Sequence, residues 1–539
     1  MLWKRYKCGK KKPPMHETNS EASIKSVRCM ARKVKSFYRE GQTDYLLPPL
    51  VLVGKQGPLG RIKPGDSVIF CCRRGERELQ LTQAFIDQNF DGFHRERLDP
   101  LTFVPFTLYH PALRHLPVAF TPRNVRETMG EALSHWGLPQ FHLAESEKYA
   151  HVTYFFNGGR ADPFPGEVDQ FVPSFLAEPL RAPPLLVEAL RKVISQSAFP
   201  FVILNIASGD LVGHYTDLEA KVACAEAVDR ALGEILEIAH QHDYWAAITA
   251  DHGLLEEHGL PGTPPNTGHT THPVPFVLVS PRGDEPALAR KGILADVAPT
   301  LLSMMDLPKP DTMTGRSLIR EMVPKTKRVM LVILDGWGLG SKGHIDPIRL
   351  AKTPCWDGIL KRPWARIEAS GEAVGLLPSA RGNSEAGHMN LGAGRVVIQD
   401  DVRIQRAMES GTFMENPTFN KAIDEAKMRN GSLHLLGLLS GASSHGRLDY
   451  FLELLKLPKS KGLGEVFLHL FTDGRSSPPG SAPKFLLRVE EEMERIGIGM
   501  LVTLVGRGLA LDRGGDYQKK TRSVYNALVL GEGIPVPYR

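Results

Sequence analysis

The chain alternates between short, nearly continuous apolar runs and longer segments with helical spacing of apolar residues. Apolar runs occupy residues 199–205, 245–250, 274–279, 328–334, 433–439, 465–471 and 500–505. Residues 218–240 instead repeat apolar side chains at the spacing of an amphipathic helix. Strands that are apolar throughout are typical of sheets covered on both faces by helices. The pattern therefore predicts an α/β fold, with further strands over 66–72 and 152–156 and helices over 27–38 and 78–88.

Composition and charge narrow the class of protein. The 539 residues exceed what one hydrophobic core holds, which predicts roughly two to four domains. The longest apolar runs are too short to span a bilayer. Six lysines and arginines within the first dozen residues account for much of the net charge of +6, which predicts a solvated, disordered tail over 1–16. We therefore expect neither a nucleic-acid nor a membrane partner. The six cysteines lack a CxxC spacing, as expected for reduced thiols in a cytoplasmic protein.

Side chains of the metal-ligating type stand next to several of the predicted strands. Ligands of open α/β sheets bind at the carboxyl ends of strands, so these residues are expected to converge. Mixed carboxylate and imidazole ligands favour Mn²⁺ or Zn²⁺ over Mg²⁺ or Ca²⁺. A serine in a glycine-rich stretch, 380–395, adds a nucleophile, and seven ligands exceed one tetrahedral ion, so two ions and phosphoryl transfer are indicated. The seven residues are Asp210, His214, Asp251, His252, His269, Asp335 and Ser384.

A second set of residues near strand ends is cationic. Arginine binds phosphate and carboxylate groups through forked hydrogen bonds, so this set predicts an anionic small-molecule substrate. Lys148 lies apart from the arginines, in the segment 145–151. The arginines are Arg74, Arg77, Arg475, Arg507 and Arg513.

Together the motifs closely resemble the cofactor-independent phosphoglycerate mutases of the alkaline phosphatase superfamily, over nearly everything after residue 25. The matching segments are 147–153, 209–214, 249–253, 269–275, 332–338, 382–388, 436–440 and 473–479. The resemblance implies an alkaline-phosphatase-like metal-binding domain and a second α/β domain, the substrate-binding or transferase domain. It also implies a monomer that interconverts 3-phosphoglycerate and 2-phosphoglycerate, in glycolysis and gluconeogenesis.

The resemblance assigns a role to each candidate residue. Asp335, Ser384, Asp251 and His252 would hold one divalent ion, and Asp210, His214 and His269 the other. Mn²⁺ is the expected metal, with Zn²⁺, Co²⁺ and Mg²⁺ as alternatives. Ser384 would accept the phosphoryl group, which Lys148 would help to hold. Glycerate would be bound by His445, Arg475, Arg507, Arg513, Arg74, Arg77 and Lys148.

The order of the motifs differs from that of the family. Asp335 and Ser384 belong near the family's N-terminus, whereas Asp210, Asp251 and His269 belong near its C-terminus. We interpret this as a circular permutation with a seam at about 319–327, although a faulty gene assembly would give the same sequence. The expected domains are then residues 124–399 for metal binding, and residues 17–123 with 400–539 for the substrate.

Several departures from the family pattern lie in the substrate domain. Ser476 stands where the family has an aspartate, thought to be the acid/base group, and the loop 441–447 retains only His445. Serine is a poor general base near neutral pH, and such a group contributes about 10²–10⁴ in rate. Two alternatives to the mutase therefore stay open. One is a metal-dependent phosphohydrolase, and the other is a catalytically impaired paralogue that binds a metal or a partner.

Overall fold

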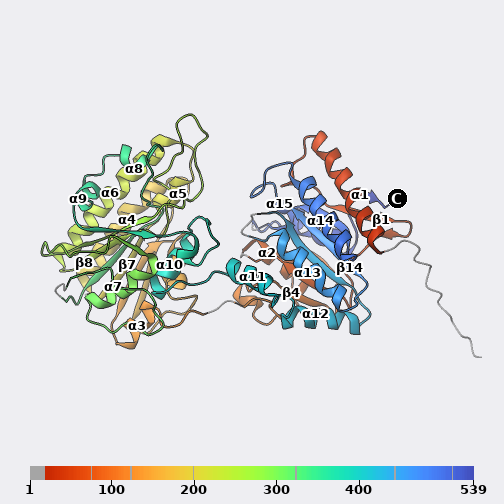
Figure 1. The fold of residues 1–539 in the computed structure, drawn as a ribbon, viewed down its shortest axis with the longest axis horizontal. Helices are drawn as coiled ribbons and strands as arrows, with labels where there is room; N and C mark the ends of the chain where they lie inside the picture. Colours follow the sequence, from red (N-terminus) through yellow and green to blue (C-terminus); the bar gives the residue numbers. More distant parts are fainter. Residues whose placement is uncertain are drawn as a thin grey trace, which may run out of the picture. The chain divides into compact units, whose positions relative to one another are not determined.

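The computed structural model describes residues 19–73, 76–121, 124–197, 199–321, 325–441, 445–512 and 514–538. It divides into two compact units, each with its own sheet (Figure 1). Unit 1 combines Met1–Pro122 with Ile404–Arg539, and unit 2 is Arg123–Arg403. The tail expected over 1–16 lies outside the described residues.

Unit 2 is built on a mixed sheet in which five neighbouring strands are parallel. The central strand β11 lies between β7 and β8, with Val329 opposite Phe201 on one side and Trp245 on the other. Because these three strands are parallel, their carboxyl ends meet at one edge of the sheet. In order across the sheet, the strands are β10 (Lys291–Ile293), β12 (Trp364–Glu368), β9 (Val274–Val279), β8 (Trp245–Thr249), β11 (Val329–Leu334), β7 (Phe201–Ile206), β5 (Gln140–Glu145) and β6 (Glu167–Val172). Strand β9 is antiparallel to β8 and β12.

Helices cover both faces of this sheet (Figure 1). Helices α4 (Ala182–Gln196) and α6 (Leu218–Gln241) pack together, and α8 (Pro347–Leu350) and α9 (Pro354–Ile359) pack on α6. Helices α3 (Met129–His135) and α7 (Val297–Met304) pack against α10 (Ser384–Ala393). The remaining helical segments are η2 (His151–Phe155), η3 (Pro179–Arg181), α5 (Ser208–Gly213), η4 (Leu294–Asp296) and η5 (Gly371–Val374), and α11 (Asp400–Ser410) runs from unit 2 into unit 1.

Unit 1 has a second sheet, in which β15, β14, β13, β3 and β4 are parallel. In order, its strands are β16 (Ile534–Pro537), β1 (Leu50–Gly54), β15 (Met500–Gly506), β14 (Val466–Thr472), β13 (Leu433–Leu439), β3 (Ser67–Cys71) and β4 (Thr102–Pro105), with β2 (Gly57–Pro58) on β1. Alternate residues of β13 face two separate cores, since Leu433 and Leu435 pack in one and Leu436 and Leu438 in the other. A strand that is apolar on both faces, and so at nearly every position, is typical of a sheet covered by helices on both sides.

The two faces of the unit 1 sheet carry different helices. The larger core contains residues of α1 (Asn19–Arg39), α12 (Pro417–Met428), α13 (Leu448–Ser460) and α14 (Ala482–Ile496). The smaller core contains residues of α2 (Glu76–Ile86) and α16 (Arg522–Val529). Short helical segments complete the unit: η1 (Pro111–Leu113), α15 (Arg507–Ala510) and η6 (Tyr517–Thr521).

The structure confirms most of the predicted elements and corrects one. The strands expected over 245–250, 274–279, 328–334, 433–439, 465–471 and 500–505 are present, as is the helix over 218–240. The strand expected over 152–156 is wrong, because His151–Phe155 forms a single π-helical turn, η2. Val152 and Phe156 are buried there, as they would be in a strand, and a short apolar run does not distinguish the two.

Within the described ranges, no helix combines the length and the apolar character needed to cross a membrane. The described cysteines, Cys29, Cys71, Cys72, Cys224 and Cys355, are free thiols.

Candidate active site

The side chains expected to bind metal ions lie at the edge of the unit 2 sheet where the parallel strands have their carboxyl ends. Asp335 follows β11, Asp251 and His252 follow β8, and Asp210 lies in α5, directly after β7. The chain turns sharply after Asp335 at Gly336, whose φ of 75° favours glycine. A side chain at Gly336 would also meet the backbone of Asp210 at 2.9 Å, so these two segments pack closely because glycine is present.

Ser384 enters this edge from α10. It is the first residue of the helix, and the preceding Asn383 caps the helix by accepting a hydrogen bond from the backbone N–H of Ala386. Gly387, on the next turn, is in close contact with Asp251, because a Cβ there would lie 2.6 Å from the Asp251 carbonyl oxygen. The glycines of the 380–395 stretch therefore allow α10 to bring a serine against the strand ends.

Lys148 is the centre of the hydrogen bonds at this edge. Its Nζ lies 2.7 Å from Asp210 Oδ2, 2.9 Å from Asp335 Oδ1 and 2.6 Å from Ser384 Oγ. Lys148 is 4% exposed, and the facing carboxylates raise its pKa despite the opposing effect of burial. The ammonium group therefore stays charged beside the Ser384 hydroxyl.

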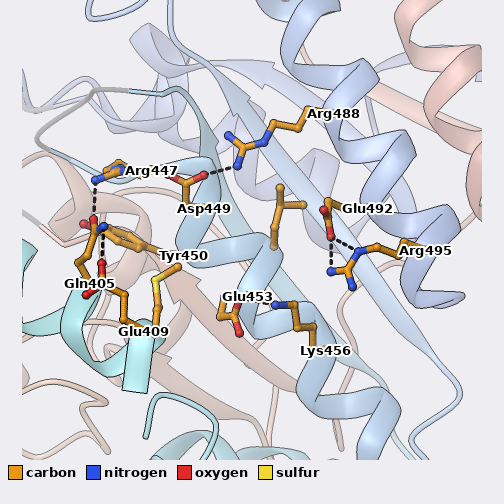
Figure 2. A pocket seen from close by; sticks show the side chains of 12 residues that line it. Gln405, Glu409, Arg447, Asp449, Tyr450, Glu453, Lys456, Arg488, Glu492 and Arg495 are labelled. Carbon is orange, nitrogen blue, oxygen red and sulfur yellow. Dashed lines mark hydrogen bonds and ion pairs between the residues drawn. The ribbon is translucent and has the colours of Figure 1, made fainter. Parts of the chain in front are cut away.

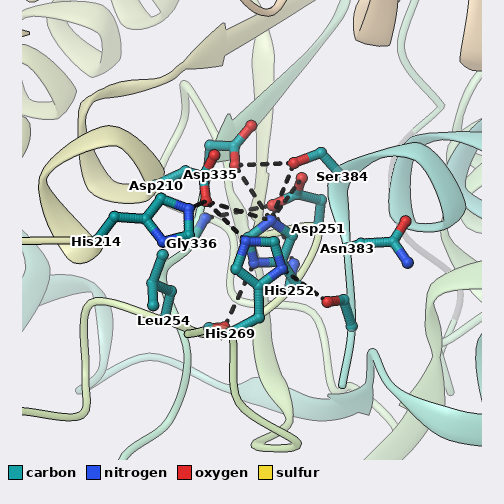
Figure 3. A network of polar contacts seen from close by, with 12 residues as sticks. Asp210, His214, Asp251, His252, Leu254, His269, Asp335, Gly336, Asn383 and Ser384 are labelled. Carbon is teal, nitrogen blue, oxygen red and sulfur yellow. Dashed lines mark hydrogen bonds and ion pairs between the residues drawn. The ribbon is translucent and has the colours of Figure 1, made fainter. Parts of the chain in front are cut away.

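Three imidazoles face the same carboxylates (Figure 3). His214 Nδ1 donates to the Thr267 carbonyl and His269 Nδ1 to the Gly382 carbonyl, both at 2.8 Å. Their Nε2 atoms consequently point toward Asp210 Oδ1, at 3.5 and 3.1 Å. His252 stacks on His269 with ring centres 4.0 Å apart and places its Nε2 3.0 Å from Ser384 Oγ. A histidine whose Nδ1 is held by a carbonyl presents Nε2 as a metal ligand.

The charges of this cluster favour a bound cation. Asp210, Asp251 and Asp335 are buried together, and Lys148 supplies a single positive charge among them. Burial and the nearby Asp251 raise the pKa of Asp335 to about 7, and burial lowers that of His252 to about 4. Asp210 Oδ1 and Asp251 Oδ2 are buried and accept no hydrogen bond within the described structure. Unsatisfied carboxylate oxygens and imidazole lone pairs that face one another fit divalent metal ions.

Two further residues hold this ligand set in place, and the sequence-based prediction of site residues omitted them. Asn205 Nδ2 donates to Asp335 Oδ2 at 2.7 Å and to His388 Nε2 at 3.0 Å. His388 Nδ1 lies 3.3 Å from Asp251 Oδ2 and donates to the Ser384 carbonyl. His388 is four residues after Ser384, so the helical period was the signal that could have linked them.

Glu256 connects the loops that carry the ligands. Its buried carboxylate accepts hydrogen bonds from the backbone N–H groups of Leu254 and Gly338, at 2.7 and 3.0 Å. It also accepts from Thr270 Oγ1 at 2.6 Å and pairs with His272 Nδ1 at 2.9 Å. One side chain thus joins the segments after β8 and β11 to the segment before β9.

A separate cluster in unit 2, His142 with Glu167 and Asp169, has the composition of a metal site but not the geometry. Its imidazole is engaged at both nitrogens, by the Val152 carbonyl at 2.8 Å and by Gln140 Oε1 at 3.1 Å. A neutral imidazole has one N–H and one lone pair, and here both ring nitrogens already lie at hydrogen-bonding distance from groups of the protein. Because burial lowers the pKa of His142 to about 4 and raises that of Glu167 to about 7, we interpret this cluster as a buried hydrogen-bonded group.

Strand ends of unit 1 carry the second candidate site. Asp473, after β14, accepts hydrogen bonds from Arg507 Nη1 at 2.6 Å, from Ser440 Oγ at 2.6 Å and from the Ser476 N–H at 3.2 Å. These contacts lower the pKa of Asp473 although burial opposes them. Arg507 is 3% exposed, so its guanidinium is fixed by the protein.

The other residues expected to bind the substrate differ in their burial and in their contacts. His445 lies 3.0 Å from the buried Glu78, through Nδ1 and Oε1. Arg475 is exposed, and Arg77 Nη1 donates to the Leu511 carbonyl at 3.4 Å. Arg74 and Arg513 lie outside the described residues.

A cavity of about 330 Å³ in unit 1 lies among α11, α13 and α14 (Figure 2). Its charged side chains pair with one another, as Asp449 does with Arg447 and Arg488 at 2.6 and 2.5 Å. Among the described residues that line it there is none of the arginines expected to bind the substrate, so we do not assign the cavity to the substrate.

The fold and the edge of unit 2 together define an α/β protein with a site for divalent metal ions. A model of the Metalloenzyme superfamily matches residues 2–309, more than half of the chain, and the chain belongs to this superfamily. A model described as the BPG-independent PGAM N-terminus matches residues 404–536.

Curated relatives carry the name 2,3-bisphosphoglycerate-independent phosphoglycerate mutase. The relative from Thermosynechococcus vestitus is 39% identical over 316 residues, which are 56% of this chain and 57% of the relative. The relative from Thermomicrobium roseum is 44% identical over 309 residues, 54% of this chain and 58% of the relative. The chain thus spans little more than half the length of these relatives. A solved structure of Leishmania mexicana phosphoglycerate mutase at low cobalt concentration is similar at 28% identity and a TM-score of 0.41, over 50% of this chain and 53% of that one.

Proposed function

We propose that this chain is a cofactor-independent phosphoglycerate mutase that interconverts 3-phosphoglycerate and 2-phosphoglycerate through a phosphoserine at Ser384. One observation carries the proposal. Ser384 Oγ lies 2.6 Å from the Lys148 ammonium and 3.0 Å from His252 Nε2, within a ring of carboxylates and imidazoles. The names of the relatives supply the substrate, and the reaction would serve glycolysis and gluconeogenesis.

Two ions, with Mn²⁺ as the expected metal, account for the number of ligands. Asp335, Ser384, Asp251 and His252 would hold one ion, and Asp210, His214 and His269 the other. Such ions would acidify the serine hydroxyl and neutralise the phosphoryl oxygens. The two groups of ligands lie next to each other, because His252 Nε2 is 3.5 Å from Asp335 Oδ1 and 3.8 Å from Asp210 Oδ1.

The chain's own groups orient the transfer. Lys148 would contact the phosphoryl oxygens, since its ammonium already contacts Ser384 Oγ. Ser384 stands at the N-terminus of α10, where backbone N–H groups and the helix dipole favour an anion. Asn205 and His388 keep Asp335 and Asp251 in place, so the nucleophile is held among rigid neighbours.

Unit 1 would hold the glycerate while the phosphoryl group is on the serine. The strand-end arginines supply charge for the carboxylate, and Arg507 is already ordered by Asp473. The glycerate would stay bound, turn over, and take the phosphoryl group back on its other hydroxyl.

A coupled assay tests the proposal. Purified protein loaded with Mn²⁺ receives 3-phosphoglycerate without bisphosphoglycerate, and enolase converts any 2-phosphoglycerate formed. We expect metal-dependent turnover and a phosphoserine at Ser384 by mass spectrometry. Ser370→Ala is the matched control, since Ser370 is a partly buried serine of unit 2 whose hydroxyl donates to the Thr271 carbonyl. Turnover that survives Ser384→Ala would refute the proposal.

A phosphohydrolase is the second candidate, and Ser476 favours it. The Ser476 hydroxyl stands 3.4 Å from Arg507 Nη1, and a hydroxyl there is a poor proton acceptor near neutral pH. If retransfer to glycerate were slow, water would release phosphate from Ser384. Inorganic phosphate without 2-phosphoglycerate, measured in the same assay, would establish this alternative.

The domain organisation extends the proposal. We infer that unit 2 is the metal-binding domain and unit 1 the substrate domain, in a circularly permuted order. The model described as an N-terminus matches residues 404–536, late in the chain, which supports the permutation. Tyr538 Oη also donates to the Ala22 carbonyl at 3.3 Å, so the segments that a relinked chain would join are neighbours.

A further inference from the structure

Glu78 and His445 form a carboxylate–imidazole pair at the strand ends of unit 1. Glu78 Oε1 lies 3.0 Å from His445 Nδ1. The Glu78 side chain is fully buried, whereas that of His445 is 16% exposed. The carboxylate is therefore shielded from solvent, and the imidazole is partly exposed.

The backbone fixes the position of His445, and the fold buries Glu78. The backbone N–H of Arg73, just after β3, donates to the His445 carbonyl at 2.9 Å, which ties the loop to the strand end. Glu78 lies in the first turn of α2 and accepts no hydrogen bond at Oε2 within the described structure. A buried carboxylate with one oxygen on an imidazole is the arrangement that orients a catalytic histidine.

Several charged or titratable groups of the described residues lie near the pair. The Arg507 guanidinium acts electrostatically on the Glu78 carboxylate. Burial raises the pKa of Cys72 and of Tyr109, which lies in the segment after β4, and that carboxylate adds to the rise. Burial raises the pKa of Glu78, while His445 and Arg507 oppose that rise. The pair therefore stands beside Arg507, the arginine proposed to hold the glycerate.

Phosphoryl transfer to and from glycerate requires a proton acceptor and donor. The oxygen that loses the phosphoryl group must gain a proton, and the hydroxyl that receives it must lose one. Asp473 is committed to Arg507 and Ser440, and Ser476 is a hydroxyl. Among the described residues at these strand ends, the His445 imidazole is the group suited to both tasks.

We propose that His445, oriented by Glu78, is the acid/base group for the glycerate hydroxyls. The proposal rests on the mutase function proposed above. In the first step the bond from phosphorus to O3 breaks, the bond to deprotonated Ser384 Oγ forms, and protonated His445 gives its proton to O3. In the second step the bond to Oγ breaks, the bond to O2 forms, and neutral His445 takes the O2 proton. Serine and histidine are both restored, and the net change is the exchange of proton and phosphoryl group between O2 and O3.

The test compares variants at each position in the coupled assay. His445→Asn should lower kcat by about 10²–10⁴-fold while KM changes by less than about tenfold, because the loss is in the chemical steps. Glu78→Gln keeps the size of the side chain and should lower kcat by at least about tenfold. Free imidazole should restore part of the activity of His445→Ala, which a purely structural role of His445 does not predict.

A matched control is the Asp66–His434 pair, which is also buried in unit 1 and has Oδ2 and Nε2 3.0 Å apart. Asp66→Asn removes a comparable carboxylate away from the strand ends, and kcat per folded molecule should not change. Circular dichroism of every variant checks folding.

The outcomes separate this inference from the proposed function. If the wild-type protein forms neither phosphoserine nor 2-phosphoglycerate, the proposed function fails and the inference with it. If the wild-type protein turns over but folded His445→Asn retains kcat and only KM rises, the inference alone is overturned. A lower kcat for His445→Asn, with imidazole rescue of His445→Ala, supports it.

Discussion

The two units collect polar side chains at the carboxyl ends of parallel strands, but they arrange charge in opposite ways. In unit 2 three carboxylates lie close together around Lys148, and two of their buried oxygens accept no hydrogen bond from the described residues. In unit 1 the central carboxylate, Asp473, is satisfied by an arginine, a serine and a backbone N–H. The carboxylates of unit 2 need bound cations to balance their charge, whereas the carboxylate of unit 1 is balanced by groups of the protein.

This difference indicates where each unit tolerates change. The unit 2 cluster is tied by many contacts, such as those of Lys148, Asn205 and Glu256, so one substitution disturbs several of them. The unit 1 site departs from the family pattern at Ser476 and in the loop 441–447, and it contains one pair that the sequence did not predict, Glu78 with His445. We infer that unit 2 sets whether a phosphoryl group is taken up, and that unit 1 sets what then receives it.

The largest effect should come from removing the nucleophile of unit 2. Ser384→Ala should lower mutase turnover by about 10⁵-fold or more, because the covalent route through phosphoserine is lost. Stopped assays with ³²P-labelled substrate should show no label on the protein. Label retained on the variant would place the nucleophile elsewhere.

Removing ligands from one side of the unit 2 cluster should have the next largest effect. The double variant Asp210→Asn, His269→Ala should lose one of two bound ions and about 10³-fold in turnover. Elemental analysis after loading with Mn²⁺ measures the ion content. Asp217→Asn with His240→Ala, outside the cluster in the same unit, serves as the control. Unchanged metal content in the double variant would contradict the assignment of these ligands.

A gain is expected in unit 1. Ser476→Asp places a proton acceptor beside Arg507 and should raise mutase turnover relative to phosphate release by up to about 10²-fold. The ratio of 2-phosphoglycerate to inorganic phosphate is measured in one reaction. Ser460→Asp adds the same charge at an exposed position of unit 1 and should leave the ratio unchanged. No gain at Ser476 would contradict the idea that a missing proton acceptor at this position limits the return of the phosphoryl group to glycerate.

The stability of unit 1 should fall in mild acid. His434 Nδ1 and His469 Nε2 are 2.9 Å apart in the sheet, and burial lowers the pKa of both imidazoles. The unfolded histidines bind protons near pH 6.5, whereas the folded ones stay neutral to lower pH. The buried neutral histidines therefore make their full contribution to the free energy of unfolding above pH 6.5, and that contribution is lost as the pH falls toward the folded pKa values.

We therefore expect Tm to drop by several degrees between pH 7 and pH 5, where ~1 kcal/mol corresponds to about 2–4 °C. His469→Gln should reduce the drop measured by calorimetry, and His94→Gln, at an exposed position, should not. Equal drops in the wild type and in His469→Gln would contradict this origin.

The smallest effect is expected from relinking the chain. Unit 1 is made of two segments and unit 2 of one, and Lys25 Nζ lies 5.0 Å from the ring centre of Tyr538. A chain joined between these residues and opened at about residue 325 should keep its circular dichroism spectrum and change Tm by only a few degrees. An insoluble relinked chain, beside a folded original, would argue against the permutation.

The sequence by itself determined the class of fold and most of the strands. The apolar runs that became β11, β8, β9 and β13 were predictable because strands buried on both faces are apolar at nearly every position. The run over 152–156 was not, because a buried helical turn and a short buried strand need the same apolar residues.

Which side chains of the candidate sites contact one another was decided by the tertiary structure. Proximity of Asp335, Asp251 and Asp210 to strand ends was visible in the sequence, but Lys148 reaches them only through the packing of the segment after β5. Glu78 looked like an ordinary charge at the start of a helix, and it became the partner of His445 because α2 buries it beneath a loop more than 300 residues away. Such pairs depend on which strands are neighbours in a sheet, and local spacing along the chain carries no information about that order.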